Sequence, residues 1–104
     1  MTDFAELEAS AAEQLHRMRR LADDIAAIRI EHRTDDGAVT AVVDGSGRLL
    51  DLSLTKGISR MSPAEFDGAV VAAAGAAAQR AMAVRGGLVD DFNNQVNNRR
   101  AGEQ

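Results

Sequence analysis

The sequence contains no cysteine, tryptophan or tyrosine, and it has a single proline and only three phenylalanines among 104 residues. Without cysteine, the chain can form no disulfide bond, no thiolate zinc site and no cysteine nucleophile. Because aromatic residues are scarce, a core would have to be built mainly from alanine, valine and leucine, and in a monomer of this length such a core would be thin. Either the fold is very regular or a second chain completes the core.

Long apolar runs and leader segments are also missing. The longest apolar run, "AVVAAAGAAA", is far shorter than a membrane span, and the start, "MTDFAELEAS", lacks the basic and apolar regions of a signal peptide. We therefore expect a cytoplasmic protein with no membrane partner. The length predicts a single domain over residues 1–98, with residues 99–104 as a flexible C-terminal tail.

A first helix is predicted over residues 4–28, with Thr2 or Asp3 as its N-cap. Its apolar positions recur every three or four residues, at Phe4, Leu7, Ala11, Met18, Leu21, Ile25 and Ile28. Such a heptad-like stripe serves equally well as a surface for a partner helix or as part of an internal core. The sequence leaves both alternatives open.

Three short segments then alternate as strands do, near residues 29–34, 38–44 and 48–54, separated by the turn signals "DDG" and "DGSG". Each has one apolar face. In the third segment, we expect Leu50, Leu52 and Leu54 to share the inner face and Leu49 to lie on the outer face. A three-stranded antiparallel sheet with one apolar face needs a cover, which the flanking helices can provide.

The second predicted helix begins at "SPAE", where Ser62 and Glu65 can form a capping box around Pro63. It extends at least to Arg85, and the pair Gly86-Gly87 suggests a kink or an early end. An unbroken helix of about 50 Å would project from a compact domain and leave its apolar stripe exposed. We therefore expect a homodimer, with interface residues at Val42, Leu49, Val84, Leu88 and Phe92.

Enzymatic chemistry is not indicated. His16 lies on the polar face of the first helix and His32 lies in a strand, so nothing brings the two together. The turn at residues 44–47 lacks the lysine and the following helix of a phosphate-binding loop. The acidic pairs at 35–36 and 90–91 lack the spacing of metal ligands. We expect a protein that is not an enzyme and that has no cofactor and no metal.

The formal net charge is −4, which is unlike a highly basic DNA-coating protein, so the placement of the arginines matters more than their number. In the first helix, the arginines at positions 17, 19 and 20 each have an acidic residue four positions away, which is typical of a solvated helix face.

A second group of arginines lacks such partners. Arg80 and Arg85 have no acidic residue three or four positions away, and Arg99 and Arg100 have only Glu103 nearby. Unpaired arginines near the end of a projecting helix suit contacts with the DNA phosphate backbone. The alternative is that their aliphatic stems cover apolar surface at a dimer seam.

The order of these segments resembles the YbaB/EbfC family of nucleoid-associated proteins. The resemblance covers about residues 4–98. It rests on "GAVTAVVDGSGRLLDLSL", with Gly37-x-Val39-x-x-Val42 and the turn at Gly45, and on "VVAAAGAAAQRA", with the spacing Val70-x-x-Ala73-x-x-x-Ala77-x-x-x-Ala81. The tail departs from the Met/Pro/Gly-rich character common in the family, and the chain is acidic overall.

This resemblance implies an α+β fold of the order α-β-β-β-α, in which a three-stranded antiparallel sheet and two long helices form a homodimer with projecting, tweezer-like helices. It also implies nucleoid-associated binding of duplex DNA with little sequence preference. The net negative charge predicts that this binding is weak and salt-dependent. Because some similar proteins of actinobacteria are associated with type VII secretion, the alternative is a dimeric protein-interaction module without DNA binding.

Overall fold

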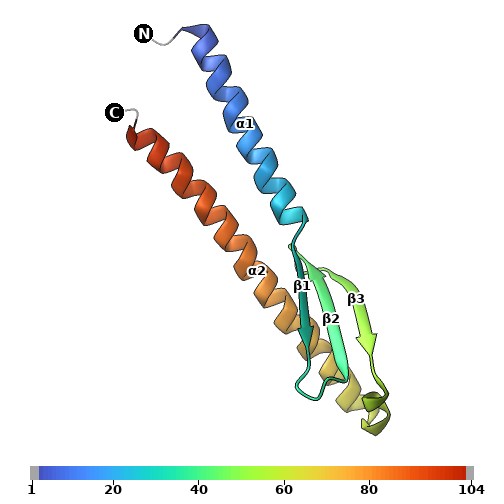
Figure 1. Ribbon diagram of the computed structural model, residues 1–104. Helices are drawn as coiled ribbons and strands as arrows, with labels where there is room; N and C mark the ends of the chain where they lie inside the picture. Colours follow the sequence, from blue (N-terminus) through green and yellow to red (C-terminus); the bar gives the residue numbers. More distant parts are fainter. Residues whose placement is uncertain (1–2, 103–104) are drawn as a thin grey trace.

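The computed structural model describes the backbone of residues 3–102 and the side chains of residues 3–98. The chain follows the predicted α-β-β-β-α order, with one addition (Figure 1). The segment between the last strand and the second helix contains a short 3-10 helix that was not predicted. The elements are α1 (Phe4–Ala26), β1 (Arg29–Arg33), β2 (Val39–Asp44), β3 (Leu49–Leu54), η1 (Lys56–Arg60) and α2 (Pro63–Gly102).

The molecule is strongly elongated, because α2 has 40 residues and is therefore about 60 Å long. Its extents are 72 × 20 × 16 Å and its radius of gyration is 20.7 Å, whereas a compact chain of this length has about 13 Å. The sheet packs on the first half of α2, and α1 lies beside the second half, so that both ends of the chain are at the same end of the molecule (Figure 1). The helix continues through Gly86 and Gly87 without ending.

The helix N-termini are capped as the sequence predicts. The Asp3 carboxylate accepts a hydrogen bond from the Glu6 backbone N–H (3.0 Å), which begins α1. At α2, the Ser62 hydroxyl accepts from the Glu65 backbone N–H (3.1 Å), and the Glu65 carboxylate accepts from the Ser62 N–H (3.4 Å). This reciprocal pair satisfies two backbone donors that a helix N-terminus otherwise leaves free.

The three strands form an antiparallel meander in the order β1-β2-β3, with β2 in the centre. Asp44 organises the β2–β3 turn, since its carboxylate accepts hydrogen bonds from the Ser46 hydroxyl (2.7 Å) and from the N–H groups of Ser46 and Arg48 (both 3.0 Å). Gly47 supplies the positive φ of 82° that closes the turn. The hydroxyl of Ser46, together with these N–H groups and the charge of Arg48, lowers the pKa of Asp44 below its ordinary value of 3.8.

The core lies between the sheet and α2, and small residues dominate it. The central strand alternates as predicted, with Val39, Ala41 and Val43 fully buried against the helix. The alanines of the family-like spacing, Ala73, Ala77 and Ala81, face them and are also buried. Because alanine carries only a methyl group, the helix axis can approach the sheet closely and bury the valines without large side chains.

The predicted face of Leu49 is wrong. The register pairs Val39 with Leu54 and Ala41 with Leu52, but it then shifts so that Val43 is opposite Leu49. This irregularity is of the β-bulge type, in which two residues of one strand oppose one of its neighbour. Directly opposed residues of an antiparallel pair share a face, so Leu49 joins the inner, leucine-bearing face of β3. Among the outward positions of β2, Val42 is the sole apolar residue.

The N-terminal part of the predicted apolar stripe does not form an internal core, because no residue of α1 is buried in the protomer. Phe4 is 75% exposed, and Leu7, Leu15 and Met18 are about half exposed or more. Only the last part of the helix approaches the core, where Ile25 packs beside buried Ile28. The two alternatives for this stripe therefore divide along its length: Ile25 and Ile28 join the core of the protomer, whereas the apolar residues from Phe4 to Met18 stay exposed.

Candidate nucleic-acid interface

Arg80 lies on the side of α2 that faces β1. Its side chain is exposed, yet its Nη1 atom donates a hydrogen bond to the backbone carbonyl of Glu31 in β1 (2.9 Å). Among the described side chains the arginine has no acidic partner, as the sequence predicts, but one end of its guanidinium is held against the sheet edge. The remaining N–H donors stay available for a phosphate oxygen.

Arg85 lies on the opposite flank of the same helix. Seven residues earlier, Ala78 touches the β2–β3 turn, since a Cβ at Gly47 would lie 3.4 Å from the Cβ of Ala78. Residues seven apart share a helix face, so Arg85 follows Ala78 on the β3 flank, whereas the five residues from Arg80 amount to a rotation of about 140°. Arg85 is exposed and has no hydrogen-bond or ion-pair partner among residues 3–98.

The other two predicted DNA-contact residues, Arg99 and Arg100, have helical backbone within α2. Their side chains lie outside the described residues. Arg99 is 14 positions after Arg85, which corresponds to a distance of roughly 21 Å along the helix axis. The four predicted residues are therefore distributed along α2 and do not form one compact patch.

The arginines of α1 are less completely paired than the sequence predicts. Arg17 forms the expected ion pair with Glu13 (3.0 Å), which is the only salt bridge among the described side chains. The expected pairs of Arg19 and Arg20 with the acidic residues four positions later do not form. Both arginines are exposed, and their guanidinium groups remain in solvent because surface ion pairs gain too little energy to fix two long side chains.

A shallow cavity of about 230 Å³ separates α1 from the second half of α2. Apolar side chains line it together with charged and polar ones of both signs, so it offers no uniform attraction for an anion. Its lining consists of Arg17, Arg20, Leu21 and Asp24 from α1 and of Leu88, Asp91, Phe92 and Gln95 from α2.

The cavity also locates the predicted dimer-interface residues of α2. Leu88 packs against the core cluster of its own protomer, and Phe92 is half-buried facing α1. Val84 is 44% exposed. On the sheet, Val42 is half-buried and its neighbours in the register are Glu31 and Asp51. The assignment of these residues to a dimer interface stays a prediction.

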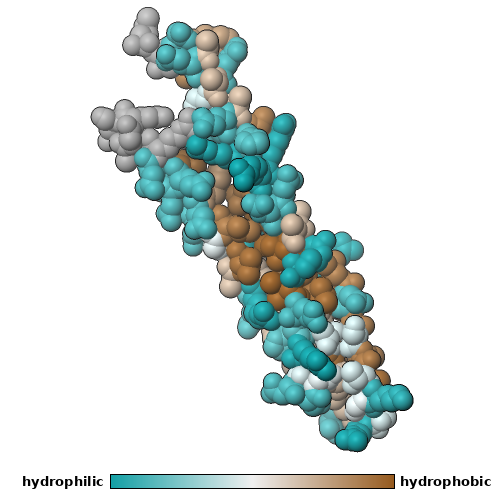
Figure 2. All heavy atoms as spheres, in the orientation of Figure 1, coloured by the Kyte–Doolittle hydropathy of each residue, from teal (hydrophilic) through white to brown (hydrophobic). Residues whose placement is uncertain are grey.

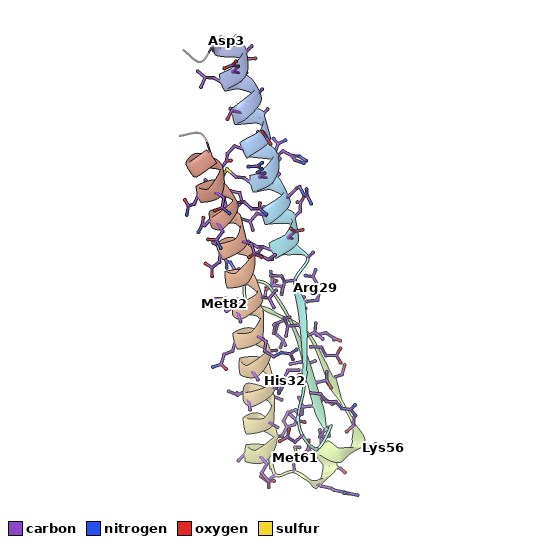
Figure 3. All side chains as sticks on the ribbon, turned by 60° about the vertical axis from the view of Figure 1, so that its left-hand side comes forward. Asp3, Arg29, His32, Lys56, Met61 and Met82 are labelled. Atoms are coloured by element: carbon purple, nitrogen blue, oxygen red, sulfur yellow. The ribbon has the colours of Figure 1, made fainter. Side chains whose placement is uncertain are left out.

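Sequence reasoning missed the role of Arg29, which lies where α1 meets the sheet (Figure 3). Its Nη1 atom donates to the carbonyls of Ala26 (3.0 Å) and Ile28 (2.8 Å), so it satisfies carbonyls that the end of α1 leaves free. A basic residue just after a predicted helix is the signal that could have found it. No comparable signal exists for the contact of Arg80 with Glu31, because the two residues are 49 positions apart.

Chemical sites of other kinds are not apparent in the described part of the chain. His16 is exposed on α1, whereas His32 is half-buried on the side of β1 that faces α2 (Figure 3). Across residues 3–98, no group of three or more potential ligand side chains is placed to hold a metal ion. No helix of the described chain combines the length and the hydropathy required to cross a membrane.

The order of elements and the capped, alanine-rich helix are shared with a family of known proteins. The family model of the YbaB/EbfC DNA-binding family matches residues 1–91. The chain belongs to the YbaB/EbfC family. A search of curated proteins gave no significant match.

Among solved structures, this YbaB/EbfC-family chain is similar to the crystal structure of the uncharacterized protein HP0035 from Helicobacter pylori. The TM-score is 0.67 with 16% sequence identity, and the match covers 88% of this chain and 98% of the other. At this identity the likeness establishes the fold alone. The resemblance noted from the strand and alanine spacings is thus confirmed both by the family model and by the fold.

Proposed function

We propose that this YbaB/EbfC-family protein is a nucleoid-associated, cytoplasmic homodimer that binds duplex DNA through its phosphate backbone with little sequence preference. Membership of a DNA-binding family supports this proposal. The single structural observation that carries it is the long, exposed α2, along which Arg85 extends into solvent without a partner among residues 3–98. Backbone contacts without base readout agree with the lack of tryptophan and tyrosine for base stacking.

The proposed contact residues are Arg80, Arg85, Arg99 and Arg100. Arg80 and Arg85 lie on opposite flanks of α2, so one duplex is expected to engage only one of them in each protomer. Two chains offer eight such arginines. If about half of them contact phosphates at once, the slope is roughly −3.6 in a plot of log affinity against log salt concentration. The net charge of −4 opposes long-range attraction, so binding is expected to be weak and to fade at physiological salt.

Fluorescence anisotropy on random-sequence duplexes, measured over a series of salt concentrations, tests the proposal. Replacing all four contact arginines with alanine should flatten the salt slope equally for every sequence. The matched control is the α1 triple variant R17A/R19A/R20A, which removes a similar charge and should keep most of the slope. If the control loses binding and the α2 variant keeps it, the contact surface belongs to α1, where Arg19 and Arg20 form no ion pair with any described side chain.

A second function, a dimeric protein-interaction module without DNA binding, is favoured by one observation. Helix α1 presents Phe4, Leu7, Leu15 and Met18 to solvent, and exposed apolar stripes of this kind mark interaction surfaces. If the wild-type protein gives no anisotropy change even at about 20 mM salt, where phosphate contacts are strongest, this second function replaces the first.

A further inference from the structure

The N-terminal part of α1 has little to pack against in the protomer. Its first turns extend beyond the last turn of α2 (Figure 1). Hydrophobic residues gather mainly around the middle of the molecule in the view of Figure 2, where the helical end is largely hydrophilic. Yet Phe4 is 75% exposed, Leu7 57%, Leu15 48% and Met18 52%. These side chains form an apolar stripe that the protomer leaves uncovered.

The stripe is not on the side of α1 that faces α2. That side carries the half-buried residues Gln14, Arg17 and Leu21, two of which line the cavity between the helices. Leu15 directly follows Gln14, and Met18 directly follows Arg17. One position along a helix is a rotation of about 100°, so the stripe lies on a flank of α1 and is free to contact another helix.

The spacing of the stripe is the same in both directions along the chain. Together with the exposed Ala11, its members are separated by steps of three, four, four and three residues. An antiparallel helix of the same sequence therefore presents the same pattern when the two Ala11 residues are opposed. Phe4 then meets Met18 of the second copy, a favourable contact of sulfur with an aromatic ring. Leu7 meets Leu15, and the small Ala11 lets the helices approach closely.

We propose that α1 pairs antiparallel with α1 of a second copy of this chain, around a two-fold axis at Ala11. Because the two helices run in opposite directions, the two sheets lie at opposite ends of the pair. A homodimer joined through its sheets, at Val42 and Leu49, cannot form this contact between its own two chains. The contact instead links one homodimer to another. The pairing goes beyond DNA binding, and only its role as a link rests on the proposed homodimer.

Charge favours the antiparallel direction over the parallel one. One end of the stripe is acidic and the other is basic, with Asp3, Glu6 and Glu8 at the first end and Arg17, Arg19 and Arg20 at the second. A parallel pair would bring like charges together along its whole length. An antiparallel pair places the acidic end of each helix beside the basic end of the other, which is the arrangement that selects direction in helix pairs.

Glu8 and Arg19 are the residues best placed for this attraction. Glu8, Ala12, Leu15 and Arg19 follow one another at helical spacing and share one flank of α1. Around the two-fold axis, equal flanks of the two helices meet. Helical side chains lean toward the N-terminus of their own helix, so in an antiparallel pair Arg19 and Glu8 of the second copy lean toward each other. In the protomer, neither forms an ion pair with a described side chain.

The contact is expected to be weak. Met18 is 14 positions after Phe4, so the stripe is roughly 21 Å long. One helix face of this length buries less than the roughly 1,200–2,000 Å² of a stable interface. Association between homodimers should therefore depend on concentration and become visible toward the millimolar range.

An engineered disulfide tests the axis, and the absence of native cysteine leaves one possible bond. Ala11→Cys places a thiol opposite itself across the axis, at the closest approach of the two helices, so mild oxidation should give a covalent dimer. The matched control is Ala9→Cys. Ala9 is also exposed on α1, but two positions rotate it by about 200° to the opposite side of the helix. The control should stay uncrosslinked.

Two charge variants test the register without oxidation. Leu7→Glu/Leu15→Glu places like charges opposite each other, whereas Leu7→Lys/Leu15→Glu places opposite charges there. Both remove the same two exposed leucines and introduce good helix formers, so both should keep the wild-type circular dichroism spectrum. In sedimentation over a concentration series, the Lys/Glu variant should associate beyond two chains about tenfold more tightly than the Glu/Glu variant.

The outcomes separate this pairing from the homodimer itself. If wild type stays at two chains throughout and Ala11→Cys does not crosslink, the pairing of α1 is overturned while the homodimer stands. Equal crosslinking of Ala9→Cys and Ala11→Cys, or equal association of the two charge variants, overturns the axis at Ala11. If Ala11→Cys crosslinks but wild type never exceeds two chains, α1 is the dimer contact itself and the link between homodimers is overturned.

Discussion

The two halves of α2 lie in different environments. In the first half, every fourth residue from Ala73 to Ala81 is buried against the sheet. In the second half, the helix faces α1 across a shallow cavity, and α1 itself contains no buried residue. The comparison shows that one continuous helix can be held by a dense core at one end and mainly by its own backbone hydrogen bonds at the other.

The difference arises from the partner of each half. The sheet offers a flat row of valines that alanines can approach closely, so many weak contacts accumulate in a small volume. The facing surface of α1 contributes Arg17, Arg20 and Asp24, whose charged ends remain in water. In the protomer alone, the projecting half gains little from burial and depends on backbone hydrogen bonds and helix propensity.

The largest effect is expected from a charge placed in the packed half. Ala77 is fully buried between Val43 and Ile28, so Ala77→Asp should leave an unpaired carboxylate in the core. Such burial costs several kcal/mol, which is comparable with the stability of a whole domain. The variant should be unfolded by circular dichroism. Ala83→Asp, an exposed position on the same helix, should melt within a few degrees of the wild type.

An opposite and smaller effect is expected in the projecting half. A Cβ added at Gly86 or Gly87 would meet nothing within 4 Å, so the substitution introduces no clash within the protomer. Each glycine in a helix interior costs about 0.5–1 kcal/mol relative to alanine, so Gly86→Ala/Gly87→Ala should raise the free energy of unfolding by about 1–2 kcal/mol. Urea denaturation of the variant measures this difference.

Gly47→Ala is the contrasting substitution, because φ at Gly47 is 82° and a side chain there is strained. It should lower stability where the helix variant raises it. A Gly86→Ala/Gly87→Ala protein that is no more stable than the wild type would contradict the expectation that these glycines lie in open space within an unconstrained helix.

The smallest effect concerns the β2–β3 turn and its pH dependence. The pKa of Asp44 is lowered in the folded state, chiefly by the Ser46 hydroxyl. The group therefore contributes stability above its unfolded pKa, near 3.8, and this contribution is lost as the pH falls through the lower, folded pKa. Asp44→Asn should flatten the acid side of a melting-temperature profile below about pH 4. An unchanged profile would contradict a folded-state role for this carboxylate.

Much of the fold could be predicted because its signals are local. The capping box at Ser62, the glycine turn at Gly47 and the alternation of β2 each depend on residues within a few positions of one another. The boundaries of α1 and the strands were therefore predicted to within two residues. The short 3-10 helix at Lys56–Arg60 was missed, since its only cap signal is the Thr55 hydroxyl that accepts from Gly57 (3.2 Å).

The candidate site was predicted less well, because it depends on how the elements meet. Sequence spacing identified Arg80 as unpaired but gave no sign of the Glu31 carbonyl that holds it. Spacing also suggested acidic partners for Arg19 and Arg20, although being one turn apart makes an ion pair possible without making it favourable. The positions of Arg80 and Arg85 on opposite flanks became clear only when the sheet fixed the rotation of α2.

By itself, the sequence determined the order of helices and strands, their caps and turns, and the family to which the chain belongs. These features follow from backbone geometry and periodicity, which act over one or two turns of chain. Only the tertiary structure decided that Leu49 faces inward and that the N-terminal part of the α1 stripe stays uncovered in the protomer. Both depend on register and on which surfaces meet, and these are set by the combined packing of segments distant in sequence.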